Sequence, residues 1–232
     1  MTDGRAAVPA GWARAGQTVA MAQERLHFDG WIGAVGTASG TRIVWGHWPR
    51  SPFGAFSDVM IEHPDGERRL LAPSRRIAEF VADTYTFEHV EVVPVEVRHD
   101  GNRWHVSAGP LVLEVVTGSR TVLGRLLCAV PAPLARSRSW AAVCDVPARL
   151  LPGVRTLGRA GPDRREWYGA RDLHRVRAAT AMLGGRNLGG LAPVEPPVTF
   201  GFGSAPRAPS VVRVTSTVEI PGAPGHRPAS TG

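Results

Sequence analysis

The chain contains no lysine, so all 27 of its lysine-or-arginine positions are arginines. Without a lysine amine, no side chain can form a Schiff base with a carbonyl substrate or with pyridoxal phosphate. The phosphate-binding loop of the G-x-x-x-x-G-K-[ST] type is excluded for the same reason. Alanine, glycine, proline and valine are used heavily alongside arginine, which is typical of a GC-rich genome.

Cysteine is also scarce. Only Cys128 and Cys144 are present, both in apolar surroundings, and no C-x-x-C pair occurs, so we expect two buried and inert thiols. The zinc motif H-E-x-x-H is missing, and the eight histidines are scattered without metal-ligand spacing. The sequence therefore predicts no metal and no cofactor.

Long apolar segments are missing as well. The longest nearly uncharged run, LLCAVPAPLA at 126–135, is about half the ~20 residues that a transmembrane helix needs, and two prolines interrupt it. The N-terminal stretch MTDGRAAVPAGWARAGQ has no continuous apolar segment of the kind found in secretory signals. We therefore expect a cytoplasmic protein with no membrane partner.

The net charge of +7 is unevenly distributed. Residues 1–116 contain 11 arginines and 14 acidic residues, whereas residues 117–232 contain 16 arginines and 6 acidic residues. The arginines occur singly among apolar residues, and no block of five or six like charges appears, so nucleic acid is not the expected partner. A non-catalytic interaction module that uses the basic C-terminal half remains open as an alternative function, with a protein or nucleic acid as partner.

Short alternating runs separated by turn residues predict a chain made mainly of strands. Asp100-Gly101-Asn102 indicates a hairpin, residues 197–204 have a β-like composition, and residues 210–220 alternate as a strand. Ser74 is a favourable N-cap for a helix of about three turns that extends to Tyr85. Two further segments that begin with serine, 119–130 and 137–151, have helical spacing.

These elements predict an α+β fold with about eight to eleven strands and about three helices. Antiparallel hairpins in such number favour a barrel-like or wrapped sheet. We expect residues 1–25 to form a flexible N-terminal segment, residues 26–220 a single domain and residues 221–232 a disordered tail.

The segment Arg164–Arg175, RREWYGARDLHR, gathers acidic, aromatic and imidazole side chains among arginines. Trp-Tyr-Gly is unfavourable at the start of a helix, so we favour a strand. A regular strand would place Glu166, Tyr168, Asp172 and His174 on one face, with successive members about 6.6 Å apart.

Two interpretations of this face stay open. Turned inward, it forms a polar cavity that orients a small molecule and offers acid and base groups. Turned outward, it is a solvated face paired with neighbouring arginines. The inward interpretation gives candidate catalytic groups, Glu166, Asp172 and His174, and candidate ligand-binding groups, Tyr168, Arg165 and Arg171.

A second candidate region is Trp45–Glu62, where prolines form a rigid turn between two strands. Trp48, Phe53 and Phe56 could cap the mouth of a cavity there, and Asp58 and Glu62 would face the same side of a strand. Phe53, Asp58 and Glu62 are the candidate ligand-binding residues of this region. The alternative is a hairpin whose aromatic side chains pack into the core.

Three segments, SPFGAFSDVMIE, RREWYGARDLHR and APVEPPVTFGFGSAPRAPSV, resemble those of an uncharacterised protein family from GC-rich bacteria. The resemblance covers residues 26–220. More remotely, the order of strands and mid-chain helices is similar to the acetoacetate-decarboxylase-like barrels, which implies a nearly closed β-barrel with a central polar cavity. Those decarboxylases act through a lysine Schiff base, so no catalytic residue carries over to this lysine-free chain.

The sequence as a whole predicts a protein that binds a small polar or anionic metabolite in a barrel cavity. Arginine would bind a carboxylate there. Any chemistry would be acid–base chemistry rather than Schiff-base chemistry.

Overall fold

The structure is a computed structural model, and it describes residues 23–131, 134, 137, 139–140, 157–160, 164–201 and 205–221. The predicted N-terminal segment and tail lie almost entirely outside these residues. Cys144 and most of the predicted helix at 137–151 lie outside them as well.

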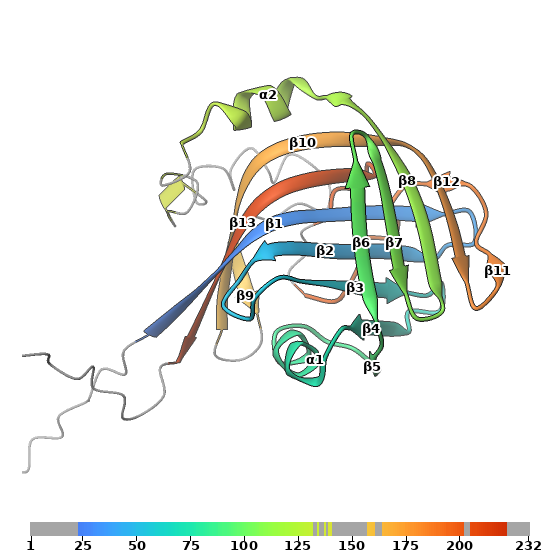
Figure 1. Ribbon diagram of the computed structural model, residues 1–232, viewed down its shortest axis with the longest axis horizontal. Helices are drawn as coiled ribbons and strands as arrows, with labels where there is room; N and C mark the ends of the chain where they lie inside the picture. The colour runs from blue at the N-terminus through green and yellow to red at the C-terminus, as the bar shows by residue number, and fades with distance from the viewer. Residues whose placement is uncertain are drawn as a thin grey trace, which may run out of the picture.

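The described residues form one sheet and two helices with defined bounds (Figure 1). The elements are β1 (Gln23–Thr37), β2 (Arg42–Arg50), β3 (Phe56–Glu62), β4 (Arg68–Ala72), α1 (Arg75–Ala82), β5 (His89–Val92), β6 (Val95–Asp100), β7 (Arg103–Ala108), β8 (Leu111–Arg120), α2 (Val122–Cys128), β9 (Leu157–Ala160), β10 (Arg164–Leu183), β11 (Arg186–Asn187), β12 (Leu191–Ala192) and β13 (Ser210–Pro221). The 13-stranded sheet has the order β5-β4-β3-β2-β1-β13-β10-β8-β7-β6, with β9 and β11 paired to β10 and β12 paired to β1.

The sheet is antiparallel except between β4 and β5, and it curls into a half-barrel. Strand β6 is at one end of the strand order, yet it contacts β3 near the other end, and Figure 1 shows β6, β7 and β8 passing in front of β1, β2 and β3. The predicted wrapped, mostly antiparallel sheet is confirmed at this level. Two helices have defined bounds within the described residues, against about three predicted; most of the third predicted helix, 137–151, lies outside these residues.

The inside of the curl is filled by apolar side chains. Trp45 and Ile61 from one half of the sheet pack with Val106 and Leu113 from the other, and all four are fully buried. β-Branched and aromatic residues pack well on pleated surfaces, and here they fill the space that the barrel resemblance implied to be a polar cavity. The inside of the curl is therefore a core.

Helix α1 begins as predicted, because the Ser74 hydroxyl accepts a hydrogen bond from the Ile77 amide. The helix ends at Ala82, one turn earlier than predicted, so Tyr85 follows it rather than belonging to it. Its buried residues, Ile77 and Val81 among them, pack against Leu70 of β4. The sheet is thus covered by α1 on the face away from the apolar core of the curl.

Helix α2 begins at Thr121, whose hydroxyl accepts a hydrogen bond from the Gly124 amide at 2.9 Å. Gly124 lies so close to β10 that an added Cβ would be 2.6 Å from the Leu173 carbonyl oxygen, so the absence of a side chain lets the helix pack there. The prediction of a buried thiol is wrong for Cys128, which is exposed at the end of this helix.

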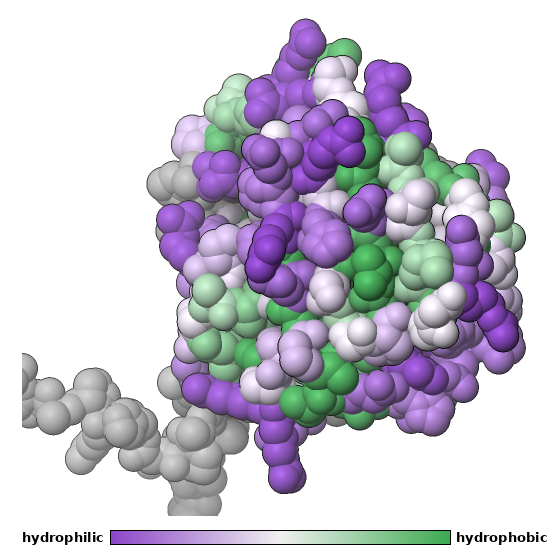
Figure 2. All heavy atoms as spheres, turned by 45° about the vertical axis from the view of Figure 1, so that its right-hand side comes forward, coloured by the Kyte–Doolittle hydropathy of each residue, from purple (hydrophilic) through white to green (hydrophobic). Residues whose placement is uncertain are grey.

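The molecular surface is mixed in character. On the face drawn in Figure 2, hydrophobic residues are scattered among hydrophilic ones. Val122 and Leu126 of α2 and Val92 of β5 are the most exposed large hydrophobic residues of the described chain. No helix within the described residues has the length and apolar character needed to cross a membrane.

Candidate functional site

Residues 164–175 are extended, as predicted, and belong to the long strand β10. The strand is not regular, because its pairing with β13 shifts between Ala170 and Asp172. Tyr168 lies opposite Ser216, but Asp172 lies opposite Arg213. Paired residues of antiparallel strands share a face, and residues three apart on β13 point to opposite faces.

The predicted single polar face is therefore wrong. A β-bulge adds one residue to a strand and so reverses the alternation beyond it. The bulge at Arg171 leaves Glu166 and Tyr168 on one face of the sheet and moves Asp172 and His174 to the other. Glu166 and Tyr168 line a cavity.

This cavity has a volume of about 70 Å³ and lies on the face of β1, β2 and β3 opposite the core of the curl. In β2, Ile43 and Trp45 point into that core, whereas Val44 and Gly46 line the cavity. The sheet, α1 and the irregular segment 198–201 enclose it. Its walls are formed by Phe28, Ile32, Val44, Gly46, Trp48, Phe56, Asp58, Met60, Phe80, Val81, Thr84, Tyr85, Glu166, Tyr168, Val198, Phe200, Gly201, Ser216 and Val218.

Glu166 is buried in this cavity among hydroxyl groups. Tyr85 Oη donates to Glu166 Oε2 and Ser216 Oγ donates to Glu166 Oε1, each at 2.7 Å. The hydroxyls of Tyr85 and Tyr168 are also 2.7 Å apart. Burial raises the pKa of Glu166, and the hydrogen bonds from the hydroxyls only partly oppose that rise.

Asp58, from β3, is the second carboxyl group in the cavity, and only 2% of it is exposed. Trp48 Nε1 donates to Asp58 Oδ1 at 3.0 Å, whereas Oδ2 has no hydrogen bond to a described residue. Burial raises the pKa of Asp58 to about 6; the bond from Trp48 opposes this shift and the charge of Glu166 adds to it. Asp58 therefore changes protonation near pH 6.

Gly46 provides the space for this arrangement. A Cβ at this position would lie 2.4 Å from Trp48 Nε1 and 2.5 Å from Asp58 Oδ1. Both distances are below any normal contact, so a side chain here would displace the indole or the carboxylate. The hydrogen bond between Trp48 and Asp58 therefore requires glycine at position 46.

The polar groups of this mostly apolar cavity can donate hydrogen bonds to a bound molecule, accept them from it, or exchange a proton with it. Burial, with the charge of Glu166 as a second cause, raises the pKa of Tyr85 well above its usual value, so its hydroxyl remains a donor. No arginine lines the cavity among the described residues, and two acids do. The lining favours an uncharged molecule over a carboxylate, because a carboxylate would be buried beside acids without a cation.

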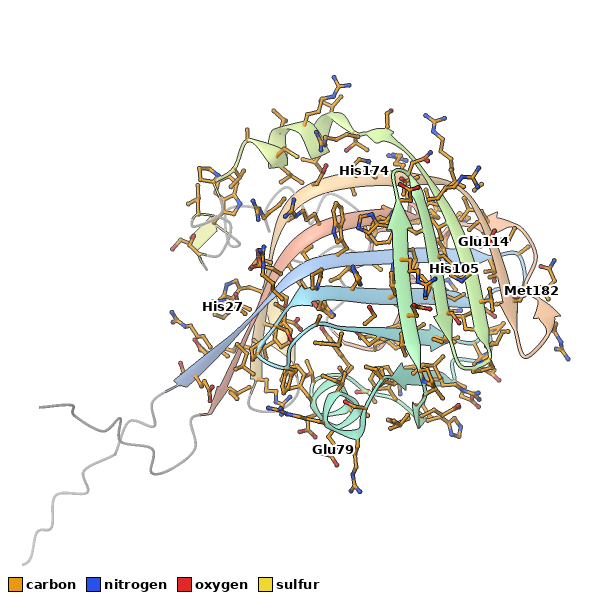
Figure 3. The ribbon with its side chains drawn as sticks, in the orientation of Figure 1. His27, Glu79, His105, Glu114, His174 and Met182 are labelled. Atoms are coloured by element: carbon orange, nitrogen blue, oxygen red, sulfur yellow. The ribbon has the colours of Figure 1, made fainter. Side chains whose placement is uncertain are left out.

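Asp172 and His174 lie elsewhere, beside α2. Arg120 Nε is 2.9 Å from Asp172 Oδ1, and His174 Nε2 is 3.2 Å from Asp172 Oδ2. Burial opposes ionisation of Asp172, but the hydrogen bonds from Arg120, the Leu173 amide and His174 outweigh it and hold its pKa below the usual value. Figure 3 shows His174 at the α2 side of the sheet and α1, with Glu79, at the opposite side.

Glu62 shares a face of β3 with Asp58, as the sequence predicts, but it is fully engaged. Its carboxylate is 2.7 Å from Arg42 Nη2 in a buried ion pair and accepts a hydrogen bond from the Thr199 amide at 2.7 Å. Glu62 thereby fixes the segment that covers the cavity, which leaves it no open position for a ligand.

The remaining predicted ligand-binding residues do not line the cavity. Phe53 packs against Phe28 and Phe80, which do line it, with ring centroids 6.1 Å and 4.8 Å away. Arg165 is exposed, and Arg171 lies on the other face of the sheet. Within the described residues, no group of three or more His, Cys, Asp or Glu side chains is placed to hold a metal ion.

Trp48 and Phe56, predicted to cap a cavity, do line it. Sequence reasoning missed Tyr85 and Ser216 as site residues, because Tyr85 fits equally well on the apolar face of a predicted helix. Ser216 is one of several hydroxyl residues on a regular strand, and nothing in the sequence distinguishes it.

No protein-family model matches the chain, and no curated protein matches it. Among solved structures, acetoacetate decarboxylase from Legionella pneumophila is similar over 85% of this chain and 85% of that chain, with 8% identity and a TM-score of 0.40. A candidate AttH protein from Nitrosomonas europaea is similar over 88% of this chain and 53% of that chain, with 11% identity and a TM-score of 0.24. At these values the similarity concerns layout alone.

Proposed function

We propose that the protein binds a small, uncharged polar molecule in the cavity and that Asp58 exchanges a proton or a hydrogen bond with it. The observation that carries this proposal is the burial of two carboxyl groups, Asp58 and Glu166, in one mostly apolar cavity. Buried acids with raised pKa values in a cleft are characteristic of ligand-binding and acid–base sites.

The size of the cavity limits the ligand. A cavity of ~150 Å³ takes up benzene, so about 70 Å³ admits a molecule of about three heavy atoms, or one end of a longer molecule. Phenyl and valine side chains would surround its apolar part. Its polar atom would lie against Asp58 Oδ2, the oxygen that has no hydrogen bond to a described residue.

The two acids have different roles in this proposal. Glu166 is held by hydroxyl groups, so it keeps Tyr85 and Tyr168 in place and raises the pKa of Asp58. Asp58, with a pKa of about 6, is protonated in a useful fraction of molecules near neutral pH and is the proton donor or acceptor. This is lysine-independent acid–base chemistry.

The test uses butanone, a ligand that can accept a hydrogen bond but cannot donate one. Butanone would bind protonated Asp58, so its affinity should fall as pH rises through about 6. One hydrogen bond to a carboxylic acid corresponds to an affinity change of about tenfold between pH 5 and pH 8. Binding is measured by ligand-observed NMR titration at both pH values.

Asp58→Asn provides the decisive comparison, because its amide can donate at either pH. The variant should bind butanone with the same affinity at pH 5 and pH 8. Asp100→Asn, an exposed substitution away from the cavity, should keep the pH dependence of the natural protein. Equal pH dependence in the natural protein and Asp58→Asn would refute the role of Asp58, and no binding by the natural protein at either pH would refute the ligand site.

A further inference from the structure

A second hollow lies on the other face of the same strands, around two irregularities in the sheet. In β10, Arg171 is the extra residue beside the pair Ala170–Val214. In β2, Trp48 and Pro49 both stand opposite Gly30, which is itself paired with Val214. Both β-bulges therefore lie at the level of Val214, one on each side of β13.

The two bulges redirect side chains into a single hollow. Bulges often occur beside functional sites, where they change the direction of a side chain and increase the local twist. Here they bring arginine residues from three strands to a hollow of about 240 Å³. It is lined by Asp29, Gly30, Trp31, Pro49, Arg50, Arg171, Arg213 and Val214.

The charge of the hollow is positive. Arg171 and Arg213 form no ion pair with a described residue, and Arg50 is 3.9 Å from its acidic neighbour, Asp29. Asp29 Oδ1 also accepts a hydrogen bond from Thr215, and Asp172 on the same face is engaged by Arg120. Three arginines against one carboxylate in the lining leave the hollow an attractive position for an anion.

One wall of the hollow is aromatic. Trp31 lies opposite Arg213 on the neighbouring strand, and the guanidinium carbon of Arg213 is 5.8 Å from the centre of the Trp31 ring. Trp31 continues into a cluster with Trp104, 5.5 Å away, and His99, 6.3 Å away. A flat apolar body can therefore lie against Trp31 while an anionic group meets the arginines.

We propose that this hollow binds a small aromatic carboxylate, with the carboxylate on Arg171 and Arg213 and the ring against Trp31. A guanidinium group matches a carboxylate through two parallel hydrogen bonds, and arginine is well suited to recognising planar anions. Compared with a ~150 Å³ cavity that takes up benzene, about 240 Å³ has room for a molecule of about ten heavy atoms. The site is separate from the Asp58 cavity, because it lies on the other face of the sheet.

The experiment compares benzoate with benzamide, which has nearly the same shape but no charge. Binding is measured by isothermal titration calorimetry at a fixed ionic strength of ~0.15 M, since exposed charges are screened by salt. Benzoate should bind at least about tenfold more tightly than benzamide, as expected for the loss of charge-assisted hydrogen bonds. Equal affinities for the two probes, or no binding of benzoate, would overturn the proposal.

Four variants locate the binding. Arg171→Gln and Arg213→Gln should each weaken benzoate binding about tenfold, and Trp31→Leu should weaken it several-fold. Arg186→Gln removes an exposed arginine of β11 outside the hollow and should leave the affinity unchanged. An equal loss in Arg186→Gln would mean that general positive charge attracts benzoate, which contradicts a built site.

Asp58→Asn separates this proposal from the proposed function. It alters the cavity and leaves the hollow intact, so benzoate affinity should not change. If Asp58→Asn abolished benzoate binding, benzoate would occupy the Asp58 cavity and the second site would be refuted, while the cavity would remain a ligand site. Circular dichroism of each variant verifies that it is folded.

Discussion

Replacing Asp58 with Asn should stabilise the protein at neutral pH and have much less effect in acid. Burial raises the pKa of Asp58 in the folded state from the ordinary 3.8 to about 6. A group whose pKa is raised by folding contributes stability fully below its unfolded pKa and loses that contribution as pH rises through its folded pKa. Ionised Asp58 therefore opposes folding above pH 6.

The size of the effect follows from the shift. A shift of one pKa unit corresponds to ~1.4 kcal/mol, so a rise from 3.8 to about 6 corresponds to about 3 kcal/mol of stability lost between acid and neutral pH. Asn has nearly the same shape, has no charge, and can still accept the hydrogen bond from Trp48 Nε1. The difference in free energy of unfolding between Asp58→Asn and the natural protein should therefore grow by about 2–3 kcal/mol from pH 4 to pH 7.

Urea unfolding followed by circular dichroism measures this difference at each pH. Using the difference between two proteins cancels the pH dependence of all other titrating groups, such as Glu88, whose pKa the hydrogen bonds from Arg68 lower to about 2. Asp100→Asn, at an exposed position, is the matched control and should give a difference independent of pH. A constant difference for Asp58→Asn across this range would show that Asp58 is not a buried acid, and the account of the cavity would be wrong.

Three further perturbations test other parts of the structure. Gly46→Ala should displace Trp48 or Asp58 and lower the free energy of unfolding in urea by about 1–3 kcal/mol. Gly190→Ala, where an added Cβ meets no atom within 4 Å, should be near neutral, and equal costs for the two variants would contradict the packing around Gly46. Glu62→Ala leaves Arg42 buried without its partner and should lower the free energy of unfolding by about 3–5 kcal/mol. Amide hydrogen exchange at Thr199 should become faster, and unchanged exchange would show that Glu62 does not hold the segment that covers the cavity. Arg120→Gln should destabilise the protein more at pH 7 than at pH 3. The pKa of Asp172 is lowered in the folded state, so the pair stabilises the protein at neutral pH and this stabilisation is lost as pH falls through the folded-state pKa. An equal effect at both pH values would contradict the Arg120–Asp172 pair.

The elements that could be predicted from the sequence are those whose signals are local. Ser74 and the apolar spacing behind it predict α1, and the alternation of residues 210–220 predicts β13. Residues 164–175 are extended, because the Trp-Tyr-Gly sequence disfavours a helix start. Each of these outcomes depends on neighbours in the chain.

The site depends on contacts that the sequence does not encode locally. Asp58 and Glu166 meet only because β3, β2, β1, β13 and β10 lie side by side in that order. The bulge at Arg171 is equally hard to place from the sequence. Gly169 inside the strand is compatible with a bulge but does not define where the register shifts, and the bulge divides the residues that a regular strand would have grouped.

The cover of the cavity shows a different limit. Residues 197–204 were predicted to be β-like, but in the described part of this segment, 197–201, no strand forms. Pro196 and Pro197 cannot donate ladder hydrogen bonds, and the Thr199 amide is used by the buried carboxylate of Glu62. A local composition typical of strands was overridden by a tertiary contact.

Strand β13 runs between β1 and β10. The thickness of this one strand separates the acidic Asp58 cavity on one face of the sheet from the arginine-lined hollow on the other. Ser216 and Val218 belong to the acidic side, and Arg213 belongs to the basic one. Replacements of Ser216 or Val218 should affect the acidic side, and replacements of Arg213 the basic side. Neighbouring residues of β13 would then contact different ligands. The residues that line one site can therefore change in sequence while those that line the other site are kept.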